Sequence, residues 1–146
     1  KVARYAPSDP FNPKSRMGAL VSETQMRRVL HYIDKGKVEN ATLVAGGKRA
    51  EGMPGYFVEP TIFDNVTNDM TIGREEIFGP VLVVMRFDEE EQAAQMANAN
   101  PYGLAAAVYT RDIARAHRLA AQIKAGTVWI NCINLYDAAS PSATSQ

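Results

Sequence analysis

Several chemistry-bearing features are scarce in this 146-residue sequence. It has one cysteine, Cys132, and two histidines, His31 and His117, which are far apart along the chain and are each expected on a helix surface. A single cysteine cannot form an internal disulfide, and this scattered set has no metal-ligand spacing. We therefore expect no metal site. Low cysteine usage favours a reducing compartment, and we expect the cytoplasm.

Net charge and long apolar runs are also missing. Sixteen basic residues balance sixteen acidic ones, and no basic stripe is present. We therefore expect no nucleic-acid partner. No apolar run approaches the roughly 20 residues of a spanning helix, so we expect no membrane partner. Neither a G-x-G-x-x-G fingerprint nor a P-loop occurs. The chain starts without Met, at Lys1, which suggests a piece of a longer protein.

The first half of the sequence predicts four segments. Ser22 and Gln25 form a capping-box pattern at the start of a helix, and Gly36 predicts its end. The expected segments are a loop, this helix, a short strand and an extended stretch broken by Pro60, at residues 1–21, 22–36, 42–45 and 56–66.

The second half alternates strands and helices. Apolar runs predict buried strands at 81–87, 105–109 and 127–132. Asp88 and Glu91 are expected to cap a helix that runs towards Asn98, and Asp112 starts a helix that ends before Gly126. The expected apolar face of the second helix is Ile113, Ala116, Leu119, Ala120 and Ile123. This alternation predicts an α/β fold with an open, mostly parallel sheet flanked by helices.

Three residues could carry chemistry on their own. Cys132 is a potential nucleophile, but its position in a buried-looking strand favours a small hydrophobic role. Glu75 and Glu76 are adjacent and should point to opposite sides of an extended segment, which argues against a cooperating acid–base pair. Spacing alone favours a solvated loop for both carboxylates.

Five motifs in register give the sequence a family resemblance. They are SDPFNPKSRMGALVSETQMRRVLHYI (8–33), GYFVEPTIFDNV (55–66), EEIFGPVL (75–82), NANPYGLAAAVYT (98–110) and GTVWINC (126–132). Together they strongly resemble the C-terminal part of the catalytic domain of NAD(P)-dependent aldehyde dehydrogenases. The resemblance covers residues 1–141, which implies a partial, Rossmann-like catalytic domain. Residues 142–146 are expected to be a disordered or non-family tail.

The resemblance implies a coenzyme contact at the turn before the third strand. Glu76 matches the glutamate that receives the hydroxyls of the nicotinamide ribose, and Phe78 matches an aromatic residue beside the nicotinamide. A carboxylate accepts two hydroxyl donors, and Gly79 and Pro80 stiffen the turn.

Further site residues are implied in the same way. Leu104 matches a position near the nicotinamide, although a core leucine explains it equally well. Gln25 and Arg28 resemble residues near the adenosine ribose, while the capping box is the competing role for Gln25. Asn134 and Tyr136, with their neighbours Ile133 and Leu135, fall where relatives line the aldehyde entrance; an ordinary loop is the alternative.

The family's catalytic groups match no residue here. Its cysteine nucleophile, its general base and its coenzyme domain precede the part that matches this chain, and Cys132 is not at the nucleophile's position. The resemblance therefore implies a fragment of a dehydrogenase that oxidises an aldehyde to a carboxylic acid with NAD+ or NADP+ through a cysteine thiohemiacetal. The parent is expected to be a homo-oligomer.

Two alternatives remain open. The chain could be a non-catalytic module that binds a nucleotide or a partner chain. It could also be a stable proteolytic piece, whose exposed apolar faces would promote self-association. In every case we expect the isolated chain to have no dehydrogenase activity.

Overall fold

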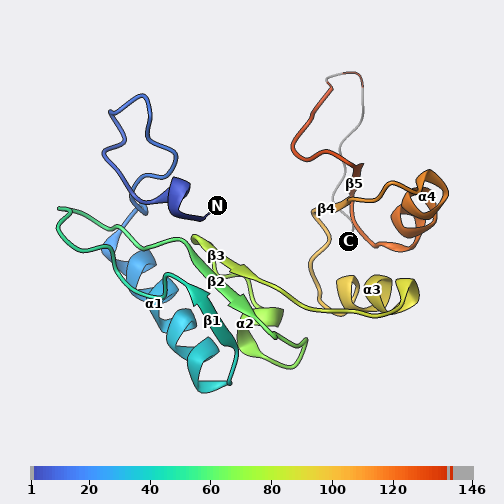
Figure 1. Ribbon diagram of the computed structural model, residues 1–146, viewed down its shortest axis with the longest axis horizontal. Helices are drawn as coiled ribbons and strands as arrows, with labels where there is room; N and C mark the ends of the chain where they lie inside the picture. Colours follow the sequence, from blue (N-terminus) through green and yellow to red (C-terminus); the bar gives the residue numbers. More distant parts are fainter. Residues whose placement is uncertain (1, 138, 140–146) are drawn as a thin grey trace. The chain divides into compact units, whose positions relative to one another are not determined.

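The computed structural model describes residues 2–137 and 139, which form two compact units divided between Arg86 and Phe87 (Figure 1). The first unit contains a short 3₁₀ helix η1 (Val2–Tyr5), helices α1 (Glu23–Val38) and α2 (Thr71–Arg74), and strands β1 (Thr42–Ala45), β2 (Thr61–Asp64) and β3 (Val81–Val83). The second contains helices α3 (Glu90–Ala97) and α4 (Ile113–Gln122) and strands β4 (Ala105–Val108) and β5 (Thr127–Ile130).

Helix α1 begins as predicted and ends later than predicted. The Ser22 hydroxyl accepts from the Gln25 amide at 3.2 Å, which is half of the expected capping box. Gly36 does not stop the helix. A side chain there would lie 2.8 Å from Ile72 and 3.1 Å from Phe63, so glycine serves close packing. The helix ends at Val38, and the left-handed conformation of Asn40, with φ of 66°, completes a Schellman motif after it.

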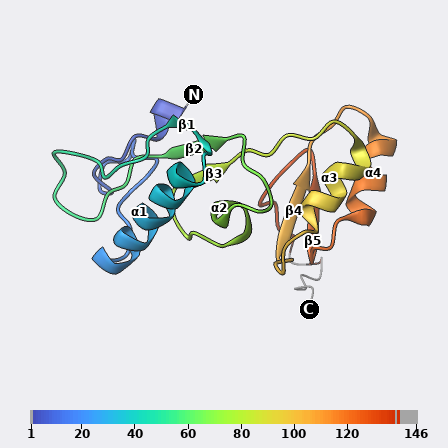
Figure 2. The ribbon, with the colours of Figure 1, turned by 90° about the horizontal axis from the view of Figure 1, so that it is seen from below.

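The first unit is a three-stranded sheet with α1 along one face (Figures 1 and 2). Strand β2 is central, antiparallel to β1 and parallel to β3. The buried residues of α1 follow helical spacing and share one core with Phe63, which is fully buried. The core comprises Met26, Val29, Tyr32, Ile33, Ala41, Val58, Phe63, Val66, Ile72 and Ile77.

The predicted buried strand at 81–87 is wrong in length and in burial. Regular pairing covers Val81–Val83 only, and Leu82 is 58% exposed. Successive side chains of a strand point to opposite faces, so Val81 and Val83 pack against the core while Leu82 points to the other face. The continuous apolar run therefore did not indicate burial on both faces.

In the second unit, β4 and β5 pair in parallel and helices α3 and α4 lie on one side of them (Figure 2). Its buried apolar residues, among those the structure describes, are Ala94, Val108, Ala116 and Trp129. Ala116 is buried as expected, but Ile113 is 62% exposed, which corrects its place on the apolar face. Ile113 is the first residue of α4 and directly follows the capping residue Asp112.

The helix starts of this unit are only partly as predicted. Asp112 caps α4 and accepts from the Arg115 amide at 3.0 Å. Asp88 does not cap α3: the N-cap is Glu89, without a side-chain bond, and the Asp88 amide donates to the Gln92 side chain.

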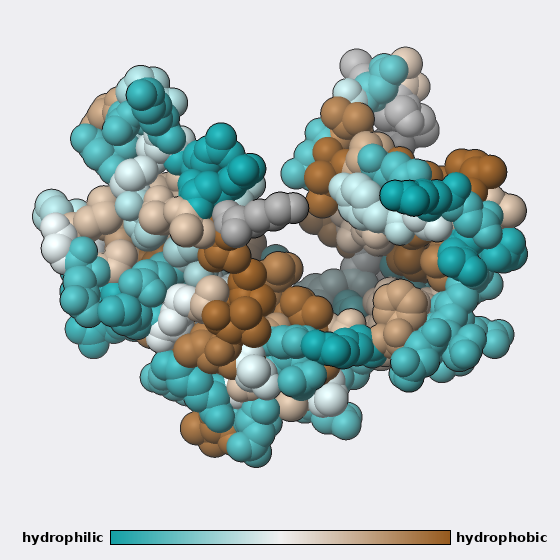
Figure 3. Space-filling view, viewed as in Figure 1, coloured by the Kyte–Doolittle hydropathy of each residue, from teal (hydrophilic) through white to brown (hydrophobic). Residues whose placement is uncertain are grey.

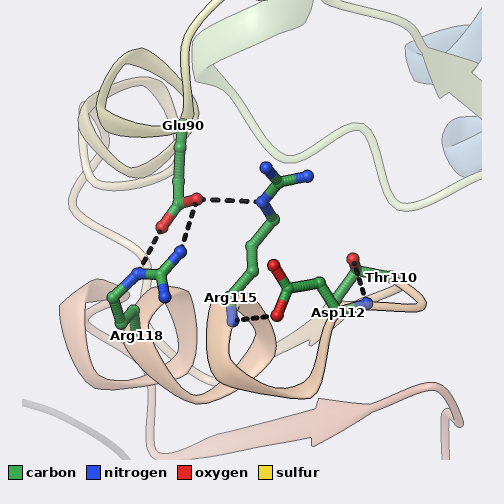
Figure 4. Close-up of polar contacts among 5 residues, drawn as sticks. All are labelled: Glu90, Thr110, Asp112, Arg115 and Arg118. Atoms are coloured by element: carbon green, nitrogen blue, oxygen red, sulfur yellow. Dashed lines mark hydrogen bonds and ion pairs between the residues drawn. The ribbon is translucent and has the colours of Figure 1, made fainter.

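Helix α3 is tied to α4 by ion pairs (Figure 4). The Glu90 carboxylate accepts from Arg115 at 3.0 Å and from Arg118 at 3.2 Å. The hydrogen bond from Arg118 and, after it, the one from Arg115 hold the pKa of Glu90 below its usual value. These pairs cross between helices and so fix how α3 lies against α4.

The α/β class and the mostly parallel pairing are confirmed, because two of the three strand pairings are parallel. The described strands form two sheets, β1–β2–β3 and β4–β5, where the sequence suggested one open sheet. The predicted tail at 142–146 lies outside the described residues.

Candidate functional site

The turn between α2 and β3 presents an aromatic ring to solvent. Phe78 is 74% exposed, and its backbone has φ of 58°, in the left-handed region that phenylalanine rarely adopts. Its neighbour Glu76 is also exposed, whereas Ile77 between them is buried in the core. The turn is thus anchored at its middle residue while it displays a carboxylate and a ring.

Helix α1 holds this turn through side-chain bonds to its backbone. The side-chain amide nitrogen of Gln25, Nε2, donates to the carbonyl oxygens of Ile77 at 3.1 Å and Phe78 at 2.9 Å. Arg28 donates to the carbonyl oxygen of Glu76 at 3.4 Å. Gln25 and Arg28 are therefore brought together with Glu76 and Phe78, as a cluster of the four coenzyme residues expected in the first unit.

Glu75 and Glu76 play different parts in this turn. The Tyr32 hydroxyl of α1 donates to the Glu75 carboxylate at 2.7 Å. This hydrogen bond, followed by burial, raises the pKa of Tyr32. Arg28 lies 5.6 Å from the centre of the Tyr32 ring, a cation–π arrangement. The Glu75 side chain is thus bonded to the helix.

An apolar pocket of about 410 Å³ begins at the residues that follow Phe78. Its lining residues come from η1, the N-terminal loop, β2 and the start of β3: Val2, Tyr5, Met17, Pro60, Thr61, Ile62, Gly79, Pro80, Val81 and Leu82. Figure 3 shows a hydrophobic band over β2 and β3 in the same place. The turn therefore borders an apolar surface.

The other expected site residues belong to the second unit. Leu104 is 70% exposed directly before β4, so it is not a core leucine within this unit. Tyr136 is 72% exposed and packs edge-on against Trp129, with ring centres 5.4 Å apart. Trp129 donates to the Leu135 carbonyl oxygen at 2.9 Å, and Asn134 has φ of 57°. The segment after β5 is thus folded back on its own strand.

The carboxyl ends of β4 and β5 meet, as expected for a parallel pair. The Asn131 side chain accepts from the Thr110 amide and donates to the Thr110 carbonyl oxygen, both at 2.9 Å. Cys132 follows the end of β5 and is half-buried. The prediction that Cys132 lies inside a buried strand is therefore wrong, because β5 ends two residues earlier, at Ile130.

The two histidines are exposed, in agreement with the expectation of surface positions. Within residues 2–137 and 139, no group of three or more His, Cys, Asp or Glu side chains is placed to hold a metal ion. None of the described helices has the length and apolarity that a membrane span needs.

Sequence reasoning missed one residue of the turn's support, Tyr32. Gln25, Arg28 and Tyr32 lie three and four residues apart, so they share one side of α1. That spacing of polar tips beside the buried stripe was a visible signal. The partner of Tyr32, however, is Glu75, which lies 43 residues away in the sequence, and no local pattern identifies it.

The fold is that of a known class of α/β protein. The model of the aldehyde dehydrogenase family matches residues 1–143. The chain belongs to the aldehyde dehydrogenase family.

Curated relatives and solved structures agree with this assignment. A betaine aldehyde dehydrogenase of Brucella anthropi is 55% identical over 130 residues, which are 87% of this chain and 27% of that protein. The aldehyde dehydrogenase of Mycobacterium tuberculosis, solved with NAD+, matches 98% of this chain and 30% of its own with a TM-score of 0.93 and 44% identity. An NAD+ complex from Bacillus cereus has a TM-score of 0.91 and 50% identity over 97% of this chain and 28% of its own. The chain thus spans about a quarter to a third of the length of these relatives.

Proposed function

We propose that this chain supplies the nicotinamide-ribose contact of an enzyme that oxidises an aldehyde to a carboxylic acid with NAD+. Glu76 receives the ribose hydroxyls and Phe78 packs beside the nicotinamide. The observation that carries the proposal is the turn itself: an exposed ring in a left-handed conformation, two residues from an exposed carboxylate. When bound, the coenzyme would supply the hydride acceptor.

The chemistry of the two side chains fits this role. An ionised carboxylate has acceptor sites only, so one glutamate can bind two neighbouring hydroxyls. A phenylalanine offers a large apolar face with few rotatable bonds, which suits a planar ring. The relatives solved with NAD+ support that coenzyme over NADP+.

Gln25, Arg28 and Leu104 complete the proposed coenzyme contacts, and Asn134 and Tyr136 line the aldehyde entrance. For Gln25 the donors of the side chain are bonded to the turn, so any ribose contact would use its carbonyl oxygen. Arg28 bonds the turn with one guanidinium nitrogen and has other N–H groups to offer a ribose. Leu104 is exposed, so its side chain is accessible to a bound ligand.

The remaining expectations about the whole protein are part of this proposal. Residues 1–141 belong to one catalytic domain of a cytoplasmic homo-oligomer whose substrate is an aldehyde. The nucleophile and general base come from outside this chain. The chain by itself therefore binds NAD+ weakly, because a few contacts offset little of the entropy lost on binding.

Saturation-transfer NMR on the chain with millimolar NAD+ tests the proposal. We expect saturation to reach the nicotinamide and its ribose more than the adenine, since Phe78 and Glu76 contact that end. The same sample with an added aldehyde should produce no NADH absorbance. Transfer to adenine alone, or turnover by the chain, would contradict the proposal.

A further inference from the structure

We propose that Tyr32 and Glu75 form a positioning pair, which sets the conformation of the turn that carries Glu76 and Phe78. The two adjacent glutamates then have different roles: Glu75 fixes the turn to α1, and Glu76 faces the ligand. The part of this inference that concerns NAD+ rests on the function proposed above. The part that concerns the conformation of the turn is independent of that function.

The contacts between α1 and the turn form a row. Tyr32 bonds the Glu75 side chain at 2.7 Å, Arg28 bonds the backbone of Glu76, and Gln25 bonds the backbone of Ile77 and Phe78. Successive helix positions thus hold successive turn residues. Because these contacts run antiparallel along one helix face, each limits a shift of the turn along α1.

Packing under the turn leaves little room for another arrangement. Val29 is fully buried, and a side chain at Gly79 would come within 2.5 Å of it. Ile77 is also in the core. The turn is therefore pinned from below by packing and from the helix side by hydrogen bonds, with the Tyr32–Glu75 bond at its first residue.

The strained residue explains why such a pair is needed. A phenylalanine with φ of 58° is disfavoured relative to extended or helical backbone, and it persists only where the surroundings determine it. Without the bond at Glu75, the turn can rotate at its entry, and Phe78 can relax to a negative φ. The direction of the ring relative to Glu76 would then change.

The experiment compares four variants: Tyr32→Phe, Glu75→Ala, Glu75→Gln and, as a control, Tyr56→Phe on the same unit. The first readout is the NMR signature of a positive φ at Phe78, a strong cross-peak between its own amide and Hα protons. We expect Tyr32→Phe and Glu75→Ala to weaken it and Glu75→Gln to restore it, since a glutamine carbonyl still accepts the tyrosine proton. The control should keep the signature.

The second readout is the dissociation constant for NAD+, measured by chemical-shift titration. Loss of one hydrogen bond should weaken binding about three- to tenfold in Tyr32→Phe and Glu75→Ala, with recovery in Glu75→Gln. A purely structural role would lower the melting temperature in Tyr32→Phe and Glu75→Ala without changing the Phe78 signature.

The outcomes separate the two proposals. An unchanged Phe78 signature in Tyr32→Phe would overturn the positioning pair, whatever NAD+ does. A changed signature in a chain that shows no NAD+ shifts at all would support the pair and contradict the coenzyme function. A changed signature in Tyr32→Phe with the NAD+ affinity of the wild type would support the pair and contradict the role of this turn in binding the coenzyme.

Discussion

At the scale of single residues, the turn depends on one unusual backbone conformation. Phe78 occupies a region of φ that favours glycine, yet its ring is largely in solvent. Packing of the ring therefore does not explain the strain within this unit. The bonds from α1 do: Gln25 bonds the carbonyl oxygens of Ile77 and Phe78, and Tyr32 bonds Glu75 at the entry of the turn.

Gly79 lies close against α1. A Cβ there would lie 2.5 Å from the Val29 side chain, which has no room to move. We expect Gly79→Ala to lower the free energy of unfolding of the first unit by about 1–3 kcal/mol through overpacking. Urea denaturation, monitored with a spectroscopic probe in this unit, would measure the change in the free energy of unfolding.

Gly18→Ala is the matched control, because its new Cβ would meet only Pro10, at an ordinary 3.6 Å. We expect a change within about 0.5 kcal/mol there. Equal effects of the two substitutions would mean that the turn does not pack on Val29 as described.

Residue roles were predictable where they are local. Ser22 as a helix cap followed from the sequence, and so did surface positions for the two histidines. Gln25 had two competing predicted roles, in the capping box and near the adenosine ribose. Its side chain does not complete the capping box and instead donates to two carbonyl oxygens of the distant turn. Gly36 was misread, because a glycine that permits close packing looks the same in sequence as one that ends a helix.

At the scale of elements, α1 is the rigid part on which the turn is mounted, and its C-terminal cap is testable. Asn40 has φ of 66°, and the Ala41 amide bonds the Gly36 carbonyl oxygen at 3.0 Å. We expect Asn40→Ala to cost about 1–2 kcal/mol of stability, since alanine disfavours this conformation.

Asn40→Gly should be neutral or slightly stabilising, because glycine is the usual residue at this position of the motif. Thermal unfolding by circular dichroism distinguishes the two variants. An alanine variant as stable as the glycine variant would argue against the left-handed cap.

The pairing of α3 with α4 predicts a pH dependence. The arginines lower the pKa of folded Glu90, so its stabilisation is present above its unfolded pKa and is lost as the pH falls through the lower folded value. We expect Glu90→Gln to weaken the second unit at pH 7 and to have little effect at pH 3. The size should be small, since both arginines are largely exposed.

Denaturation midpoints at the two pH values would check this, with Glu91→Gln on the same helix as the control. A loss of stability that is equal at pH 3 and pH 7 would show that the carboxylate acts through something other than its charge.

Element types followed from the sequence better than pairing did. The helices α1 and α4 and the strands β1, β4 and β5 lie close to their predicted ranges. The apolar run from 81 to 87 gave a strand that is too long, because edge strands and central strands can share a composition. The separation into two sheets depends on contacts between distant segments, which periodicity does not encode.

At the scale of the whole chain, much apolar surface is exposed. Leu82, Leu104 and Tyr109 are between 58% and 70% exposed, and the described part of the second unit has four buried apolar residues. Surface of this kind favours association. We expect the weight-average mass in sedimentation equilibrium to rise above that of one chain as the concentration increases.

A mass equal to a single chain over the full concentration range would contradict this expectation. Leu82→Ser is the informative variant, because it removes one exposed side chain from the edge strand without touching the core.

The family was predictable from the motifs and not from composition. EEIFGPVL, NANPYGLAAAVYT and GTVWINC led to the family that the comparisons confirm. The site was predictable only as far as residues match those motifs. The role of Tyr32 was not predictable, because its hydrogen bond is to a residue 43 positions away and is seen only in the folded chain.

The most direct test of the central claim is the NAD+ affinity of Glu76→Gln and Phe78→Ala, measured by chemical-shift titration against the unaltered chain and a Glu91→Gln control. We expect both turn variants to weaken binding, each by about tenfold, with the control unchanged. Affinity that stays the same in both turn variants, in a chain that binds NAD+, would contradict the assignment of this turn to the coenzyme.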